Sequence, residues 1–293
     1  MVAAEPVVAP HARRRVRPMR FDRPRGVRRI ARYVVLVVVG AFVLFPIYTT
    51  VVAALKPGNE VLNNPLVPES LTLDVLREAW TTGHLGRYLV NSLVVAVVVT
   101  LFQVVTSVLA AYAFAMLDFP GRRALFLVFL ATLLIPFEVT VVVNRRTVDS
   151  LGWLNTYQGL AVPFLATAFG TFMLRQVFLA FPRDLRDAAA IDGVGHVGFL
   201  RHVGVPLVRP TIAALALFSF LSTWNQYLWP NLITTESDMN TVQSGLRLLA
   251  TTTLDQPNLV MAGTIIAAIP IFVVLILFQR QLVRGLTEGA VKG

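Results

Sequence analysis

Six long apolar runs alternate with polar segments along this chain. An arginine-rich segment precedes the first run, and a polar loop with a short amphipathic piece near residues 71–80 follows it. Each run approaches or exceeds the about 20 residues that an α-helix needs to cross a bilayer. The pattern therefore predicts an all-α polytopic membrane protein. Its six transmembrane helices are expected at residues 33–55, 89–117, 124–143, 160–181, 211–230 and 259–278.

The third run is the weakest of the six, because Pro136 and Glu138 interrupt it. An acidic side chain at membrane depth is a functional candidate by default. The alternative is that Glu138 lies near the outer surface, where a helix break leaves backbone groups in need of partners. Both interpretations stay open, and Glu138 is kept as a candidate residue of a substrate pathway.

The composition supports a membrane protein. Hydrophobic residues make up 56% of the chain and charged residues 14%, and the mean hydropathy is +0.68. The net charge of +10 would suggest a nucleic-acid partner in a soluble protein. Ten arginines precede Tyr33, however, and such a tail favours anionic lipid headgroups on the cytoplasmic side. We therefore expect a disordered cytoplasmic tail over residues 1–32, contact with membrane lipid, and no nucleic-acid partner.

The charge distribution also sets the expected orientation. Six helices place both termini on one side, and the arginine-rich N-terminus makes that side the cytoplasm. The loop over residues 181–210 then faces the cytoplasm with most other basic residues. Arg145 and Arg146 are the exception, and they either snorkel from a helix end or lie on an interfacial helix. The expected divisions after the tail are a first transmembrane helix at 33–55, a membrane core at 88–280 and a cytoplasmic C-terminal tail at 281–293.

The loop between the fourth and fifth runs has the pattern of a short helix, a turn and a second short segment. Pro182 suits the first position of a helix, and Asp184 suits the positive end of the helix dipole. Gly193 is a natural stop, since glycine enters the left-handed conformation freely.

This loop resembles the "EAA" loop of ABC-importer permeases, and its pattern is most similar to that of the maltose-type carbohydrate permeases. Asp187 stands where the family has glutamate, and Leu200 stands where it usually has phenylalanine. The end of the fifth run is similar to the family's S-W-N-E-F-L-W-P segment, and the chain ends in the family's G-A-V-K-G. The residues matched to the loop motif are Asp187, Ala188, Ala189, Asp192, Gly193 and Pro206.

The resemblance implies a coupling role for this loop between the fourth and fifth helices. Asp187 would accept hydrogen bonds from, or pair with, a basic group on an ATPase subunit. Ala188 and Ala189 would permit close helix approach, and Asp192 would cap or brace the turn at Gly193. The loop would then transmit the motion of the ATPase to the membrane helices.

The resemblance further implies the permease subunit of an ATP-driven importer in the bacterial cytoplasmic membrane. The cargo would be a carbohydrate, namely a sugar, an oligosaccharide, a polyol or a glycerol phosphate. The partners would be a second permease subunit in a heterodimer, two ATPase subunits and an extracytoplasmic solute-binding protein. The chain has no phosphate-loop motif and no cysteine, so we expect no enzymatic activity and no cofactor of its own, with ATP bound by the partner.

Polar and aromatic side chains at the end of the fifth run are candidates for contact with the cargo. They are Trp224, Asn225 and Gln226, the last of which replaces the acid of the family pattern. Trp229 is assigned to an interfacial aromatic belt. His196 and His202 have no ligand-like neighbours in sequence and are expected on the loop surface.

An ion-coupled secondary transporter is the alternative function. Such a protein needs charges within the membrane for ion coupling, and usually detectable repeats. Only Glu138 qualifies as such a charge.

Overall fold

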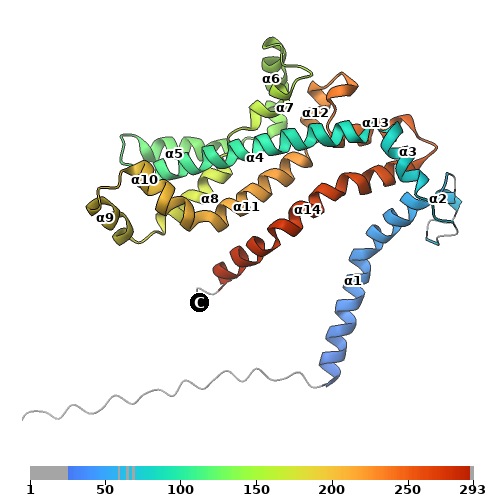
Figure 1. Ribbon diagram of the computed structural model, residues 1–293, viewed down its shortest axis with the longest axis horizontal. Coiled ribbons are helices and arrows are strands. Elements are labelled where there is room, and N and C mark those ends of the chain that lie inside the picture. Colours follow the sequence, from blue (N-terminus) through green and yellow to red (C-terminus); the bar gives the residue numbers. More distant parts are fainter. Residues whose placement is uncertain (1–25, 59, 64–65, 68–69, 291–293) are drawn as a thin grey trace, which may run out of the picture. The chain divides into compact units, whose positions relative to one another are not determined.

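Every regular element in the described part of the chain is a helix (Figure 1). The computed structural model describes residues 26–58, 60–63, 66–67 and 70–290. The chain separates into two units, residues 1–47 and residues 48–293. Helix α1 (Gly26–Leu55) supplies the described residues of the first unit. The longer helices of the second unit are α3 (Asp74–Thr82), α4 (Leu85–Met116), α5 (Arg122–Ala131), α6 (Phe137–Ser150), α8 (Ala168–Leu179), α9 (Arg183–Ile191), α11 (Val205–Trp224), α13 (Val242–Thr252) and α14 (Pro257–Ala290).

Shorter helical pieces connect these elements. They are α2 (Glu60–Asn63), η1 (Thr132–Leu134), α7 (Tyr157–Ala161), η2 (Val162–Phe164), α10 (His196–Phe199), η3 (Leu200–Gly204), α12 (Leu228–Ile233) and η4 (Ser237–Met239).

The number of helices that are long and apolar enough to cross a membrane agrees with the predicted six when bent pairs are included. Among the described residues, four helices qualify alone, at Arg29–Leu55, Leu85–Met116, His196–Trp224 and Pro257–Gln279. Two pairs of helices, each separated by a bend, are apolar and long enough together, and they give six spans if each pair is counted as one. The bend is 98° between Arg122–Leu134 and Phe137–Ser150, and 41° between Tyr157–Phe164 and Ala168–Leu179.

The third span was predicted as one helix over residues 124–143, and this prediction is wrong because the chain bends there. Ile135 is extended, with φ −90° and ψ 111°, because the ring of the following proline excludes the helical region for the residue before it. Helix α6 therefore starts afresh after Pro136 and leaves α5 at a steep angle. Arg145 and Arg146 lie on α6, and Nε of Arg145 donates to the Leu232 carbonyl of α12 at 3.0 Å.

The fifth predicted span, residues 211–230, is wrong at both ends. One continuous helix runs from His196 through α10, η3 and α11 to Trp224, so the second half of the predicted loop belongs to the span. The piece η3 is a wide π-helical turn, and it directly precedes Pro206, whose nitrogen has no hydrogen to donate.

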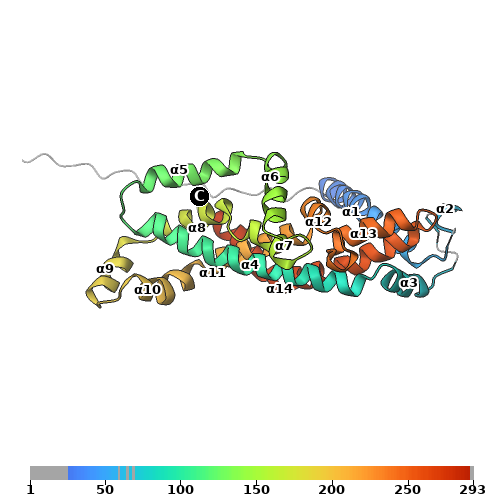
Figure 2. The ribbon, with the colours of Figure 1, turned by 90° about the horizontal axis from the view of Figure 1, so that it is seen from above.

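The centre of the second unit is formed by α4, α8 and α11, which pack against one another (Figure 2). Gly170 of α8 allows the close approach, since a Cβ atom there would lie 2.5 Å from the Ser107 hydroxyl of α4 and 2.9 Å from Leu215 of α11. Both Ser107 and Leu215 are fully buried. Small residues at such contacts are the usual means by which membrane helices approach closely.

The ends of the chain differ in part from the prediction. Helix α1 begins at Gly26, so the predicted disorder over residues 1–32 is wrong for residues 26–32, while residues 1–25 lie outside the described part. Helix α14 continues to Ala290, so most of the predicted tail at 281–293 is helical. The amphipathic piece predicted near residues 71–80 is confirmed as α3.

Candidate functional site

The turn after α9 has the hydrogen bonds of a Schellman motif. The Val194 N–H donates to the Ala189 carbonyl at 2.9 Å, and the Gly193 N–H donates to the Ala190 carbonyl at 3.1 Å. Gly193 has φ +71°, in the left-handed region that glycine adopts without steric cost. The helix stop predicted at Gly193 is therefore confirmed, and the direction in which α9 leaves the bundle is fixed by local backbone bonds.

The outer face of α9 is open and carries an unpaired carboxylate. Asp187 and Ala188 are exposed, whereas Ala189 is half-buried against the core formed by α4, α8 and α11. Among the described residues, the Asp187 carboxylate makes no hydrogen bond and no ion pair. Ile191, at the end of the same helix, is 86% exposed. An exposed small-residue helix that combines a free acid with a large aliphatic side chain can bind a complementary surface on another protein.

The loop is tied to the bundle through Tyr112 of α4. The Tyr112 hydroxyl and Nδ1 of His196 are hydrogen-bonded at 3.1 Å. The Tyr112 ring also meets Phe178 of α8 edge-on, with centroids 5.8 Å apart, and lies 6.3 Å from the ring of Phe199. His196 is exposed, as predicted for a residue of the loop surface, and it is also hydrogen-bonded to the bundle. No sequence signal reveals this contact, because the two residues are 84 positions apart.

Arg175 joins three helices at the end of the bundle that carries α9. Nε of Arg175 in α8 donates to the Phe114 carbonyl of α4 at 3.2 Å. Its guanidinium lies 4.1 Å from the centroid of the Phe126 ring in α5, a cation–π arrangement. The end of the bundle next to α9 is thus cross-linked by side chains, so α9 is attached to a stiff support.

The other predicted site residues are not brought together. Trp224 is 1% exposed and stacks on Phe220 with centroids 5.6 Å apart, so it is a core residue rather than part of an open surface. Asn225 is exposed at the end of α11, and its side-chain amide donates to the Leu221 carbonyl at 2.8 Å. Gln226 is half-buried beside it.

Glu138 lies in the first turn of α6, exposed, where a carboxylate suits the positive end of the helix dipole. Among the described residues, no hydrogen bond or ion pair joins Glu138 to the end of α11. Its position at a helix start agrees with the plainer of the two interpretations of this acid.

Trp229 is a buried anchor, so its assignment to an interfacial belt is wrong. The side chain is fully buried, and its indole N–H donates to the Gly159 carbonyl of α7 at 3.0 Å. The rings of Phe137 and Phe164 pack against it with centroids about 6 Å away. Nearby, Asn155 has φ +54° and accepts hydrogen bonds from two backbone N–H groups of the segment after α12. These contacts bind α6, α7 and α12 into one block.

A bundle of up to six apolar spans with a short, exposed helix between two of them is the arrangement of a multi-pass membrane protein. The chain belongs to the family of binding-protein-dependent transport system inner membrane components, which it matches over residues 103–288. It is therefore a transport permease subunit, and it lies in the cell membrane with several spans. The resemblance drawn from the loop motif is confirmed at the level of the family.

Named relatives cover nearly the whole chain. The chain is 38% identical over 275 residues to the sn-glycerol-3-phosphate transport system permease protein UgpE of Agrobacterium fabrum (strain C58 / ATCC 33970), with 90% of this chain and 98% of the relative covered. It is 36% identical over 267 residues to the protein of that name in Yersinia pestis bv. Antiqua (strain Antiqua), with 88% and 95% covered.

A solved structure has the same fold. It is a bacterial ABC transporter involved in the import of the acidic polysaccharide alginate, with a TM-score of 0.75, 20% identity, and 87% of this chain and 96% of that chain covered. A second structure, of a bacterial alginate transporter in complex with a pentasaccharide-bound periplasmic protein, matches with a TM-score of 0.64 and 14% identity. At these identities the likeness shows the fold alone.

Proposed function

We propose that this chain is one of two permease subunits of an ATP-driven importer that carries a hydroxyl-rich organic solute, a carbohydrate or a polyol phosphate, across a bacterial cell membrane. The observation that carries the proposal is α9, an exposed helix held by a Schellman turn and by Tyr112, whose Asp187 carboxylate has no partner in the part of the chain that the structure describes. Relatives named for sn-glycerol-3-phosphate transport, and an alginate importer of the same fold, support the class of cargo.

In this proposal α9 docks in a groove on an ATPase subunit. Asp187 pairs with a basic group of that subunit, and Ala188 permits close approach of the two surfaces, while Ala189 lets α9 pack closely on the permease itself. Asp192 and Gly193 hold the turn that sets the angle of α9. ATP is bound by the ATPase pair, which supplies the free-energy difference between the two states of the permease.

The continuous helix after the loop provides a path for the motion. It spans 29 residues from His196 to Trp224, about 43 Å at 1.5 Å per residue. Pro206 lies at the start of α11, directly after the wide turn η3, where the helix can accommodate a change of angle. A displacement of α9 is therefore delivered to Asn225 and Gln226 at the far end of α11. We propose these two residues, with Glu138, as residues of the substrate pathway.

The remaining parts of the proposal concern orientation and assembly. The excess of arginine near the N-terminus favours the cytoplasm for both termini and for α9. The full transporter then contains a second permease subunit, two ATPase subunits and an external solute-binding protein. The membrane core over residues 88–280 is the permease core in this scheme.

Uptake by the reconstituted transporter tests the proposal. Liposomes that contain the purified complex, with ATP enclosed on the side of the ATPase subunits, are expected to accumulate solute. This accumulation is expected to continue when an ionophore collapses the ion gradients. Asp187→Arg is expected to abolish this uptake while membrane insertion stays normal. Asp255→Arg is the matched control, because Asp255 is also exposed but lies between α13 and α14. Uptake that stops with the ionophore and ignores ATP would instead support an ion-coupled transporter.

A further inference from the structure

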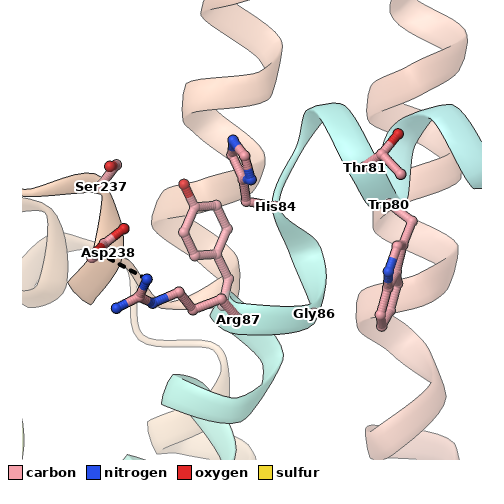
Figure 3. A pocket seen from close by; sticks show the side chains of 8 residues that line it. Trp80, Thr81, His84, Gly86, Arg87, Ser237 and Asp238 are labelled. Carbon is pink, nitrogen blue, oxygen red and sulfur yellow. Dashed lines mark ion pairs between the residues drawn. The ribbon is translucent and has the colours of Figure 1, made fainter.

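A cavity of about 500 Å³ lies at the end of α4 opposite to α9 (Figure 3). Its walls come from α3, from the start of α4, and from η4 in the segment between α12 and α13. The volume falls within the range of about 300–1,000 Å³ that is usual for small-molecule sites. This α3–α4 cavity contains none of the residues assigned above to coupling or to the substrate pathway.

One wall of the cavity is an aromatic face. Trp80 of α3 is 46% exposed, and its ring lies against the backbone of Gly86 in the first turn of α4. A Cβ atom at Gly86 would lie 2.8 Å from Trp80 Cζ2, so only glycine leaves room for the ring in this position. The turn between the two helices holds His84 at φ +48°, an uncommon backbone for a residue other than glycine.

Another part of the lining is an ion pair between two partly exposed side chains. The Arg87 guanidinium and the Asp238 carboxylate lie 2.9 Å apart, and their side chains are 57% and 60% exposed (Figure 3). The backbone of the η4 segment is held in place from behind, because the buried Asn91 amide donates to the carbonyls of Asp238 and Asn240 at 2.9 Å each. The pair therefore presents fixed donors and acceptors to the cavity with no net charge.

A third feature of the cavity is the hydroxyl group of Tyr88. Tyr88 also lines the cavity, and its side chain is only 2% exposed, with the ring packed against Gly245 in the core. Among the described residues, no group forms a hydrogen bond with the Tyr88 hydroxyl. The hydroxyl oxygen is not itself buried, so it is accessible from the cavity and can donate or accept a hydrogen bond there.

We propose that the α3–α4 cavity binds a single uncharged sugar ring, as a recognition site for the cargo on the side of the membrane opposite to the coupling loop. A sugar ring has a C–H face that stacks on an indole, and hydroxyl groups that both donate and accept. Asp238 accepts from such hydroxyls, Arg87 donates to them, and the Tyr88 hydroxyl can do either. This inference rests on the proposed import of carbohydrate.

The charge balance decides against an ionic ligand. An anion would be attracted by Arg87 but repelled by Asp238 at a similar distance. A cation would be attracted by Asp238 and repelled by Arg87. An uncharged, hydroxyl-rich ring is the ligand that uses both members of the pair at once. The site therefore differs in chemistry from one that binds sn-glycerol 3-phosphate, because a phosphate group favours an arginine without a neighbouring carboxylate.

Binding of saccharides to the intact transporter in nanodiscs tests the inference. The probes are D-glucose, maltose and trehalose, with sn-glycerol 3-phosphate as the anionic comparison, titrated by saturation-transfer NMR. We expect at least one neutral saccharide to bind, and Trp80→Ala to raise its Kd by at least about tenfold. Gly86→Ala, which displaces the ring without removing it, is expected to raise the Kd in the same direction. Arg77→Ala is the matched control, because Arg77 is exposed on α3 outside the cavity.

A charge variant tests the class of ligand. Asp238→Asn leaves Arg87 without its counter-charge, so binding of sn-glycerol 3-phosphate is expected to strengthen relative to the neutral saccharides. No binding of any of the three saccharides, or a Kd unchanged by Trp80→Ala, overturns the inference. A preference unchanged by Asp238→Asn overturns the assignment of an uncharged ligand. If uptake depends on ATP but no saccharide binds at the cavity, only this inference is contradicted. If uptake does not depend on ATP, the proposed function is contradicted.

Discussion

The left-handed turn at Gly193 gives the sharpest quantitative prediction for the coupling loop. Gly193 has φ +71°, and the space around a Cβ atom added there is empty to 4 Å. A side chain at this position therefore meets no neighbour, and its cost comes from the backbone conformation alone. The series Gly193→Asn, Gly193→Ala and Gly193→Val should follow the tolerance of each residue for the left-handed region.

The size of the effect follows from the known cost of that conformation. A residue with a Cβ atom loses about 1–2 kcal/mol in the left-handed helical region, which lowers the ratio of the closed turn to its open forms by about 5- to 30-fold. Asparagine adopts the region more readily than alanine, and a β-branched residue is the least tolerant. Proline would in addition remove the N–H that donates to Ala190, so Gly193→Pro is expected to abolish uptake.

The assay is ATP-driven uptake by the reconstituted transporter, with the amount of assembled complex measured in parallel. We expect uptake to decline in the order Asn, Ala, Val, with Ala lower than the parent protein by about fivefold or more. Gly152→Ala is the matched control, since Gly152 also has a left-handed φ, of +68°, and open space around it, but lies between α6 and α7.

Two results would refute this reasoning. Equal uptake by the alanine and valine variants and the parent protein would mean that the turn does not set the position of α9 during transport. An equal loss of uptake in Gly152→Ala would mean that the effect comes from general destabilisation and not from the loop.

Three further predictions concern contacts that support the site. Tyr112→Phe removes the hydrogen bond to His196, worth about 1 kcal/mol, and should lower uptake severalfold with unchanged assembly; equal uptake would argue against this link. Trp229→Phe leaves a buried carbonyl without its donor, and should lower the unfolding free energy by about 1–3 kcal/mol in thermal unfolding; an unchanged Tm would contradict the anchor role. Gly245→Ala places a Cβ atom against the Tyr88 ring, so overpacking should destabilise the protein by about 1–3 kcal/mol, which the same measurement checks.

Local sequence signals predicted the elements whose cause is local. The apolar runs predicted six spans, which agrees with the structure when each bent pair is counted as one span, since the length of hydrocarbon to be crossed is the same for every helix. Gly193 predicted the end of α9, because the turn needs a residue that accepts positive φ. The exposed Asp187 was found by its place in a motif and not by physical argument from its neighbours.

The boundaries and the tertiary contacts could not be predicted in this way. Apolar composition continues through Pro136, so hydropathy alone did not show that the chain turns sharply there. The loop residues before Pro206 were predicted to be separate from the fifth span, yet their backbone bonds continue into it. The contacts of Tyr112 with His196 and of Trp229 with Gly159 join residues far apart in sequence, which no pattern in a single chain reveals.

Cross-linking from α9 tests the central claim most directly. The chain has no cysteine, so Ala188→Cys introduces a unique thiol on the exposed face of α9. In the assembled transporter we expect a short bifunctional reagent to join this thiol to the ATPase subunit, and the yield to change when ATP is bound. A thiol at exposed Leu73, just before α3, is expected to give no such product. Absence of an ATPase adduct from Ala188→Cys, or labelling of that thiol from outside the cell, would contradict the account.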